Sequence, residues 1–196
     1  WLLARGWRGR SVFGPAASPA ERVTLALGVA LLFVALLPFR GGLARVPMLD
    51  ALIYAIPYSA ALLAMLCLVP RPGTLTTLIL GQALLAQLLG GNLNPLTWPY
   101  HLWIAWSAEA AFLATGANPR ALLTALSVAL ARGAVSNAYS YALLAPLLWR
   151  KVYAPWYIAA KVSLGLVGCA LGAWLAWSWA RRWVGSGQAA PPTAGG

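Results

Sequence analysis

Charged residues, and acidic ones above all, are scarce in this chain, and their scarcity excludes most soluble functions. Of 196 residues only 3 are Asp or Glu and 9% are charged in all, whereas 61% are hydrophobic. A soluble globular domain averages about 25% charged residues. The composition therefore excludes a soluble enzyme and a disordered chain. The net charge of +11 does not predict a nucleic-acid partner, because the basic residues lie between hydrophobic runs rather than on a hydrophilic face.

Metal-ligating and catalytic residue types are also few. His101 is the single histidine, so the chain has no multi-histidine metal site and no bis-histidine haem site. Cys67 and Cys169 lie inside hydrophobic runs, without the spacing of a metal or disulfide site. The sequence has no acidic pair for acid–base catalysis and no Gly-x-x-x-x-Gly-Lys-Ser/Thr loop for ATP. We therefore expect no catalytic residue, metal or cofactor, and we predict that the protein is not an enzyme.

Six hydrophobic stretches approach the length of a membrane span, which is about 20 apolar residues for about 30 Å of hydrocarbon. They comprise residues 23–39, 48–69, 74–89, 97–115, 120–149 and 156–180. The fifth is long and contains Gly133, Ser136 and Asn137, so we expect a kink or a tilt there. The pattern predicts an all-α integral membrane protein, multi-pass in the cell membrane, with six transmembrane helices in one compact bundle.

The distribution of basic residues predicts how this bundle is oriented. Residues 1–22 form a basic N-terminal segment, 23–183 the transmembrane domain, and 184–196 a tail rich in Gly, Ala and Pro that we expect to be disordered. Eight of the 14 Lys and Arg residues fall on the side of the N-terminus and four on the opposite side. Because cytoplasmic loops carry an excess of Lys and Arg, we predict that both termini are cytoplasmic. The chain begins at Trp1 rather than Met, so we expect a short segment to precede it.

Strongly polar side chains gather in the half of the bundle away from the termini, the predicted outer half. Such groups are costly in a bilayer and usually face the protein interior or a water-filled cavity. We therefore expect a binding cavity that opens to the exterior. Its candidate residues are Gln87, Asn94, Trp98, His101, Trp106, Glu109, Asn137, Tyr141 and Lys161.

Glu109 is the one acidic residue that we place well inside a span, roughly 18 Å along the fourth stretch at 1.5 Å per residue. Trp98 lies on the same helical face, and Trp106 flanks it. A carboxylate beneath indole rings suits a planar ligand that carries an amino group or a positive charge. The alternative is an ion pair between Glu109 and Arg132 or Lys161.

Residues 90–101, which join the third and fourth stretches, have two interpretations. The segment is dense in Gly, Pro, Asn and aromatic residues. Turn formation and an interfacial aromatic belt explain this composition. Alternatively, the segment is a lid over the outer cavity, with His101 in a hydrogen-bonding role.

Small residues recur at helical spacing in two stretches and mark close helix packing. Ala26 and Ala30 form a small-xxx-small pair in the first stretch, and Gly165, Gly168 and Gly172 form a stripe in the sixth. Either set fits packing within the bundle or the docking of a partner.

Four short motifs carry a family resemblance. They are Ile53-Tyr54, Arg71-Pro72-Gly73, Leu88-Leu89-Gly90-Gly91-Asn92 followed by Pro95, and Ala108-Glu109-Ala110-Ala111-Phe112-Leu113-Ala114-Thr115. With them the stretch 53–115 resembles the substrate-binding S components of energy-coupling factor (ECF) transporters, closest to the YkoE-like branch for hydroxymethylpyrimidine or thiamine.

The resemblance implies six helices, cytoplasmic termini and an outward-facing site for a small heterocyclic vitamin or precursor. It also implies a transmembrane coupling (T) component and a pair of ABC ATPases as partners, with Ala26 and Ala30 at the contact to the coupling component. Arg132 and Lys161 place extra positive charge near the predicted cavity, and this charge argues against a thiamine-type cation as the ligand. The alternative function is a non-catalytic structural subunit of a larger membrane complex, such as a respiratory assembly.

Overall fold

The described part of the chain, residues 17–41, 48–90, 94–148 and 150–187 of a computed structural model, is all-helical and contains no strand. The predicted all-α class is therefore confirmed. Its six main helices are α2 (Pro19–Gly41), α3 (Asp50–Leu68), α4 (Thr74–Leu89), α5 (Trp98–Ala114), α6 (Leu122–Tyr139) and α8 (Pro155–Gly187). Three of them contain segments long and apolar enough to cross a membrane: Pro19–Pro38, Asp50–Leu68 and Pro155–Arg182. Thr74–Leu89 is a shorter apolar helix.

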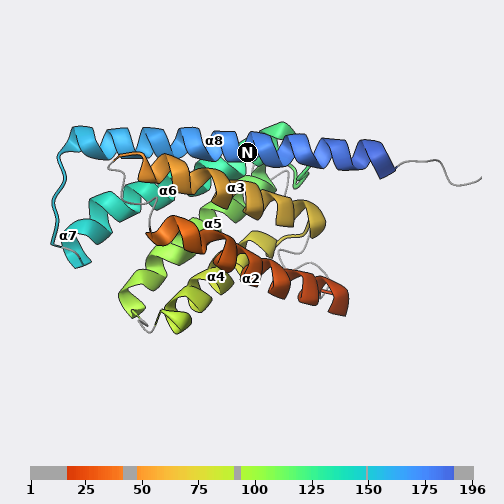
Figure 1. Cartoon of the computed structure of the whole chain (residues 1–196), viewed down its shortest axis with the longest axis horizontal. Coiled ribbons are helices and arrows are strands. Elements are labelled where there is room, and N and C mark those ends of the chain that lie inside the picture. Colours follow the sequence, from red (N-terminus) through yellow and green to blue (C-terminus); the bar gives the residue numbers. More distant parts are fainter. Residues whose placement is uncertain (1–16, 42–47, 91–93, 149, 188–196) are drawn as a thin grey trace, which may run out of the picture.

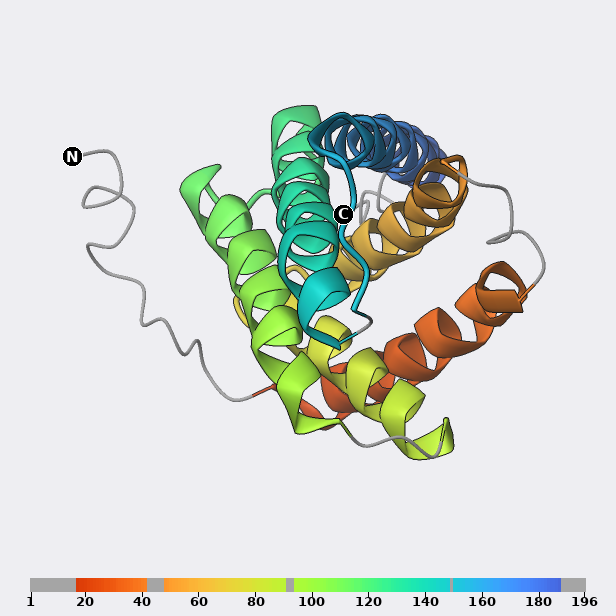
Figure 2. The same ribbon diagram turned by 90° about the vertical axis from the view of Figure 1, so that its left-hand side faces the viewer.

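The helices pack side by side in a closed ring (Figures 1 and 2). Around the ring, α2 contacts α4, α4 contacts α5, α5 contacts α6, α6 contacts α8, α8 contacts α3, and α3 returns to α2. Large apolar side chains from several helices fill the interior, among them the fully buried Leu66, Leu78, Phe112 and Val128. Consecutive main helices run in opposite directions, so the bundle has two ends. We call them the Arg71 end, where α4 begins, and the Asp50 end, where α3 begins.

Local sequence explains how the Arg71 end is closed. The Ser18 hydroxyl accepts a hydrogen bond from the Glu21 amide at 3.2 Å, and the Glu21 carboxylate accepts one from the Ser18 amide at 2.7 Å. This reciprocal cap satisfies two free amides at the start of α2. The same carboxylate forms an ion pair with Arg71 at 2.5 Å and so joins α2 to the α3–α4 turn. Gly73 has a φ of +89° in that turn, a conformation that favours glycine.

In the glycine stripe of α8, Gly168 and Gly172 pack against α3, and Gly165 faces Asn137 of α6. A Cβ atom on Gly168 would lie 2.6 Å from the Leu52 carbonyl oxygen, and one on Gly172 would lie 2.4 Å from the Ile56 carbonyl oxygen. Only hydrogen fits between the two backbones at these positions. Packing within the bundle is therefore the correct interpretation of this stripe.

The small-residue pair of α2 has the opposite environment. Ala26 and Ala30 are exposed, and they share the outer face of the helix with Val23, Leu27 and Leu31, which are 56–66% exposed. Packing within the bundle is therefore the wrong interpretation for Ala26 and Ala30. The docking of a partner therefore stays open as the interpretation of this pair.

Three predicted boundaries need correction. The first helix begins at Pro19, inside the predicted N-terminal segment 1–22, and residues 1–16 of that segment lie outside the described part. The tail was expected to be disordered from residue 184, but α8 continues to Gly187, and residues 188–196 lie outside the described part. In the fifth stretch the regular helix ends at Tyr139, and a π-helical segment, Ser140–Leu144, leads into the short α7 (Ala145–Leu148). The interruption thus follows Gly133 by two turns. Gly133 is needed for packing instead, because its Cβ would lie 2.5 Å from the Cys169 sulfur.

Candidate ligand-binding site

A cation surrounded by tyrosines occupies the Asp50 end. Lys161 on α8 is 2% exposed, and its ammonium group forms an ion pair with the Asp50 carboxylate at the start of α3. The same group lies 5.6 Å from the ring centroids of both Tyr141 and Tyr157. Cation–π contact and ion pairing together stabilise a charge in a nearly water-free position. Of the predicted site residues, Lys161 and Tyr141 are therefore brought together.

The tyrosine rings in this cluster form flat, partly open surfaces. Tyr153 and Tyr157 stack at 4.9 Å between centroids with an interplanar angle of 12°, and Tyr141 meets Tyr153 edge-on at 5.6 Å. All three side chains are half-buried. Aromatic faces in this position suit a planar ring as a ligand.

A second polar group joins α5 to α6 at the same end. The Tyr100 hydroxyl lies 2.8 Å from the Ser136 hydroxyl, and the Tyr100 ring contacts His101 at 4.9 Å. Trp98 meets His101 edge-on at 6.2 Å. Asn137 follows on α6, where its amide donates to the Gly133 carbonyl and lies against Gly165 of α8. The structure thus places Trp98 beside His101, while Asn137 follows Ser136, whose hydroxyl lies next to Tyr100.

The segment before α5 is held by its own turn chemistry. The Asn94 side chain accepts a hydrogen bond from the Leu96 amide at 3.0 Å and caps a 3-10 turn, Pro95–Thr97. The Gln87 amide donates to the Thr97 hydroxyl at 2.9 Å and ties this turn to α4, while its carbonyl oxygen is buried without a partner. Turn formation is therefore confirmed for residues 94–97, and residues 91–93 lie outside the described part.

Glu109 lies at the Arg71 end, and its carboxylate caps α4. One oxygen accepts from the Gly73 amide at 2.8 Å, and the other accepts from the amide and the hydroxyl of Thr76, each at 3.2 Å. Gly73 offers no side chain to cap the helix, so α5 supplies the cap instead. The alternative of an ion pair with Arg132 or Lys161 is therefore wrong, because Lys161 pairs with Asp50 and Arg132 contacts Ser59 and Cys169.

Replacing Glu109 with glutamine is expected to destabilise the protein. The substitution removes a negative charge from a helix N-terminus and leaves a single acceptor oxygen for three donors, which costs about 1–2 kcal/mol. A thermal unfolding scan in detergent measures this as a lower midpoint. Glu21→Gln is the matched control: its carboxylate is 32% exposed, so we expect a smaller change. Equal midpoints for wild type and Glu109→Gln would contradict the capping role.

Trp106 lies apart from the other candidates. It is 65% exposed and contacts Trp103 at 5.3 Å between ring centroids. Both indoles line an apolar groove of about 500 Å³ between α4 and α5, which Thr76 also lines. Trp106 and Trp98 therefore have different ring partners, so the predicted indole pair above Glu109 is not formed.

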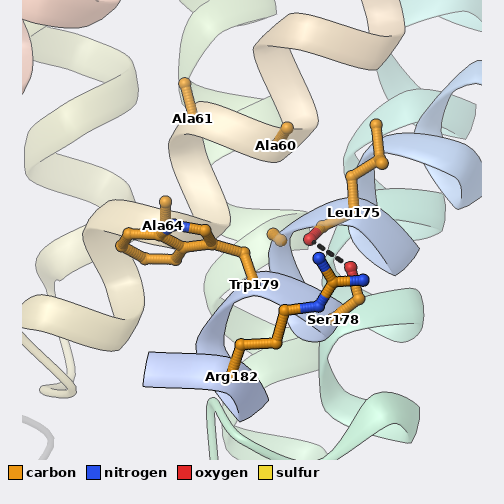
Figure 3. Close-up of a pocket in the computed structure, with 8 residues that line it drawn as sticks. Ala60, Ala61, Ala64, Leu175, Ser178, Trp179 and Arg182 are labelled. Carbon is orange, nitrogen blue, oxygen red and sulfur yellow. Dashed lines mark hydrogen bonds between the residues drawn. The ribbon is translucent and has the colours of Figure 1, made fainter. Parts of the chain in front are cut away.

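A second groove, of about 460 Å³, lies between α3 and α8 (Figure 3). Alanines of α3, including Ala60 and Ala64, form its floor, while Trp179 and Arg182 of α8 border it. Its lining is mostly apolar, with Ser178 and Arg182 as the polar members, and contains none of the predicted site residues. The polar candidates at the Asp50 end thus form a region distinct from both grooves.

Arg132 is the residue whose importance the sequence did not reveal. It lies near the middle of α6, is 5% exposed, and contacts α3 and α8. The sequence analysis treated it as a possible partner for Glu109 and as extra positive charge near the cavity, but not as a site residue. Asp50 was also missed, because it stands in the first turn of a span, where an acidic residue is unremarkable. Asp50 and Lys161 lie at a similar depth from the same end of their spans, and this similarity could have predicted their ion pair.

No family model, curated protein or solved structure matches this chain. Its function is therefore inferred from the residues and their geometry.

Proposed function

We propose that this chain is the substrate-binding membrane subunit of an ECF-type ABC importer for a small heterocyclic vitamin or precursor of the thiamine or hydroxymethylpyrimidine type. In this proposal all six main helices cross the membrane, with both termini in the cytoplasm and the Asp50 end outside. The observation that carries the proposal is the buried Lys161 beside stacked tyrosines at that end. A planar heterocycle stacks on such rings and receives hydrogen bonds from the polar side chains around them.

The exposed face of α2 supports the partner side of the proposal. A transport cycle driven by ATP needs an ATPase subunit, since this chain has no phosphate-binding loop. Ala26 and Ala30 offer a coupling component a surface on which two helix backbones approach closely.

Ligand titration tests the site directly. We expect a small heterocycle of this class to quench the fluorescence of the 11 tryptophans saturably in protein held in lipid nanodiscs, with thiamine and hydroxymethylpyrimidine as the first compounds titrated. Tyr141→Ala removes one ring of the cluster and is expected to weaken binding at least tenfold, because base–aromatic stacking is worth about 1–3 kcal/mol. Val152→Ala, at an 88% exposed position of the same end, is the control and leaves binding unchanged.

Co-purification separates this function from its alternative. Protein expressed at native levels is expected to bring down a coupling component and ABC ATPases. Recovery with redox subunits, together with the absence of saturable quenching, would establish a structural subunit of a larger complex instead.

A further inference from the structure

The chain has no carboxylate side chain left for Arg132. It contains 3 acidic residues, and each is engaged elsewhere. Glu21 pairs with Arg71, Asp50 pairs with Lys161, and Glu109 caps α4. Arg132 is therefore a buried cation that no acidic side chain of its own chain neutralises.

The groups that do contact Arg132 are weak acceptors. One terminal nitrogen lies 3.1 Å from the Cys169 sulfur and 3.4 Å from the Ser59 hydroxyl, and the guanidinium carbon lies 4.3 Å from the centroid of the Tyr58 ring. A thiol is a poor acceptor, and 3.4 Å is long for a hydrogen bond. The Arg132 Nε atom is buried without any partner. The guanidinium thus keeps a free donor, and its charge is offset only by the face of the Tyr58 ring and by weak acceptors, not by an anion.

Such a group is expensive to bury unless an anion joins it. An isolated charge in an apolar interior costs several kcal/mol, and intramembrane arginines accordingly mark ligand or ion pathways. The planar guanidinium matches the two oxygens of a carboxylate. Because Arg132 contacts both α3 and α8 from α6, a side chain of another protein has little access, and the anion is a small molecule.

The position of Arg132 fits a ligand that enters from the Asp50 end. Ser136 and Asn137 lie about one turn further along α6 toward that end, and both are half-buried. Lys161, the other buried cation of this region, is already neutralised by Asp50. A ligand with one negative charge would neutralise the remaining guanidinium, that of Arg132.

We propose that the ligand of this subunit carries a carboxylate group that binds the guanidinium of Arg132. The inference rests on the proposed function and narrows it, since it selects anionic heterocycles over the thiamine cation and over neutral hydroxymethylpyrimidine. Arg132 is then the residue that determines ligand charge.

The first test needs no ligand. Arg132→Met removes an unneutralised charge and is expected to raise the thermal midpoint of the ligand-free protein by roughly 2–4 °C. Lys161→Met is the matched control, because it deletes an equally buried cation but leaves Asp50 without its partner. We expect it to lower the midpoint. A lower midpoint for Arg132→Met as well would assign Arg132 a structural role and overturn the proposal.

The second test compares acids with their amides. Pyridine-3-carboxylate and pyrimidine-5-carboxylate are each added, beside the matching carboxamide, to wild type and to Arg132→Met in nanodiscs. We expect at least one acid to raise the midpoint of wild type at a concentration tenfold or more below that of its amide, and we expect Arg132→Met to lose this preference.

Two outcomes would overturn the inference. In the first, thiamine, hydroxymethylpyrimidine or an amide raises the thermal midpoint of wild type and of Arg132→Met by the same amount. The proposed function would survive this result. The second is protection by neither acid. The proposed function itself fails only when no heterocycle of any charge binds and no ATPase co-purifies, so the two failures are distinguishable.

Discussion

Gly172→Ala is expected to destabilise the bundle even though alanine is the better helix former. The new Cβ would lie 2.4 Å from the Ile56 carbonyl oxygen, an atom that the α3 backbone holds in place. The two helices must separate to admit it, and overpacking of this kind costs typically about 1–3 kcal/mol. The intrinsic gain of about 1 kcal/mol for alanine over glycine offsets only part of that cost. Gly172→Val adds two more carbons and is expected to prevent recovery of folded protein.

Gly28→Ala provides the control for this prediction. Its Cβ would meet the terminal methyl carbon of Met65 at 2.3 Å, which is as close as the contact at Gly172 but involves a flexible side chain. Since methionine repacks readily, we expect a change within about 1 kcal/mol. The measurement is the midpoint of thermal unfolding of both variants in the same detergent. Indistinguishable midpoints for the two would mean that α3 and α8 are not in rigid contact.

Ala26→Leu combined with Ala30→Leu is expected to abolish uptake while leaving the fold and ligand binding intact. Both residues are exposed on α2, so larger side chains disturb nothing inside the bundle. In the proposed transporter the two leucine side chains hold the backbone of the coupling component away from α2. We expect uptake of the ligand to fall at least tenfold and the ATPases to be lost on purification.

Ala110→Leu is the matched control for the docking face. Ala110 is exposed on α5, so the same change in volume occurs on another side of the bundle. We expect normal uptake and normal recovery of the ATPases. Wild-type uptake by the α2 double variant would place the partner elsewhere on the molecule.

Helix positions were predictable because helix hydrogen bonds are local and hydrophobic runs bounded by Pro and Gly mark the ends. The third predicted stretch and α4 have the same limits, Thr74–Leu89, and α5 differs from its prediction by one residue at each end. The end of α6 is an exception to this agreement, because it depends on the local backbone conformation. The π-helical segment after Tyr139 keeps a helical backbone and leaves no signal in hydropathy.

Partners of polar side chains were predictable only in part. Depth along the helices correctly brought Lys161 near Tyr141. The same reasoning misassigned Glu109, because distance along one helix does not show which neighbouring helix begins beside it. The Glu109 carboxylate meets an amide 36 residues earlier in the chain, and Lys161 meets an acid 111 residues away.

By itself, the sequence determined that the chain is a set of apolar helices with few charges, because composition and hydrophobic run length act through local backbone energetics and solvation. The tertiary structure decided which small residues lie between helices and which face outward, and which charge each acid neutralises. Those outcomes depend on the order of helices around the ring. Three acids and the three buried or half-buried Lys and Arg side chains of the described residues, Arg71, Arg132 and Lys161, allow several pairings, and only the packed bundle selects the one that leaves Arg132 without a carboxylate.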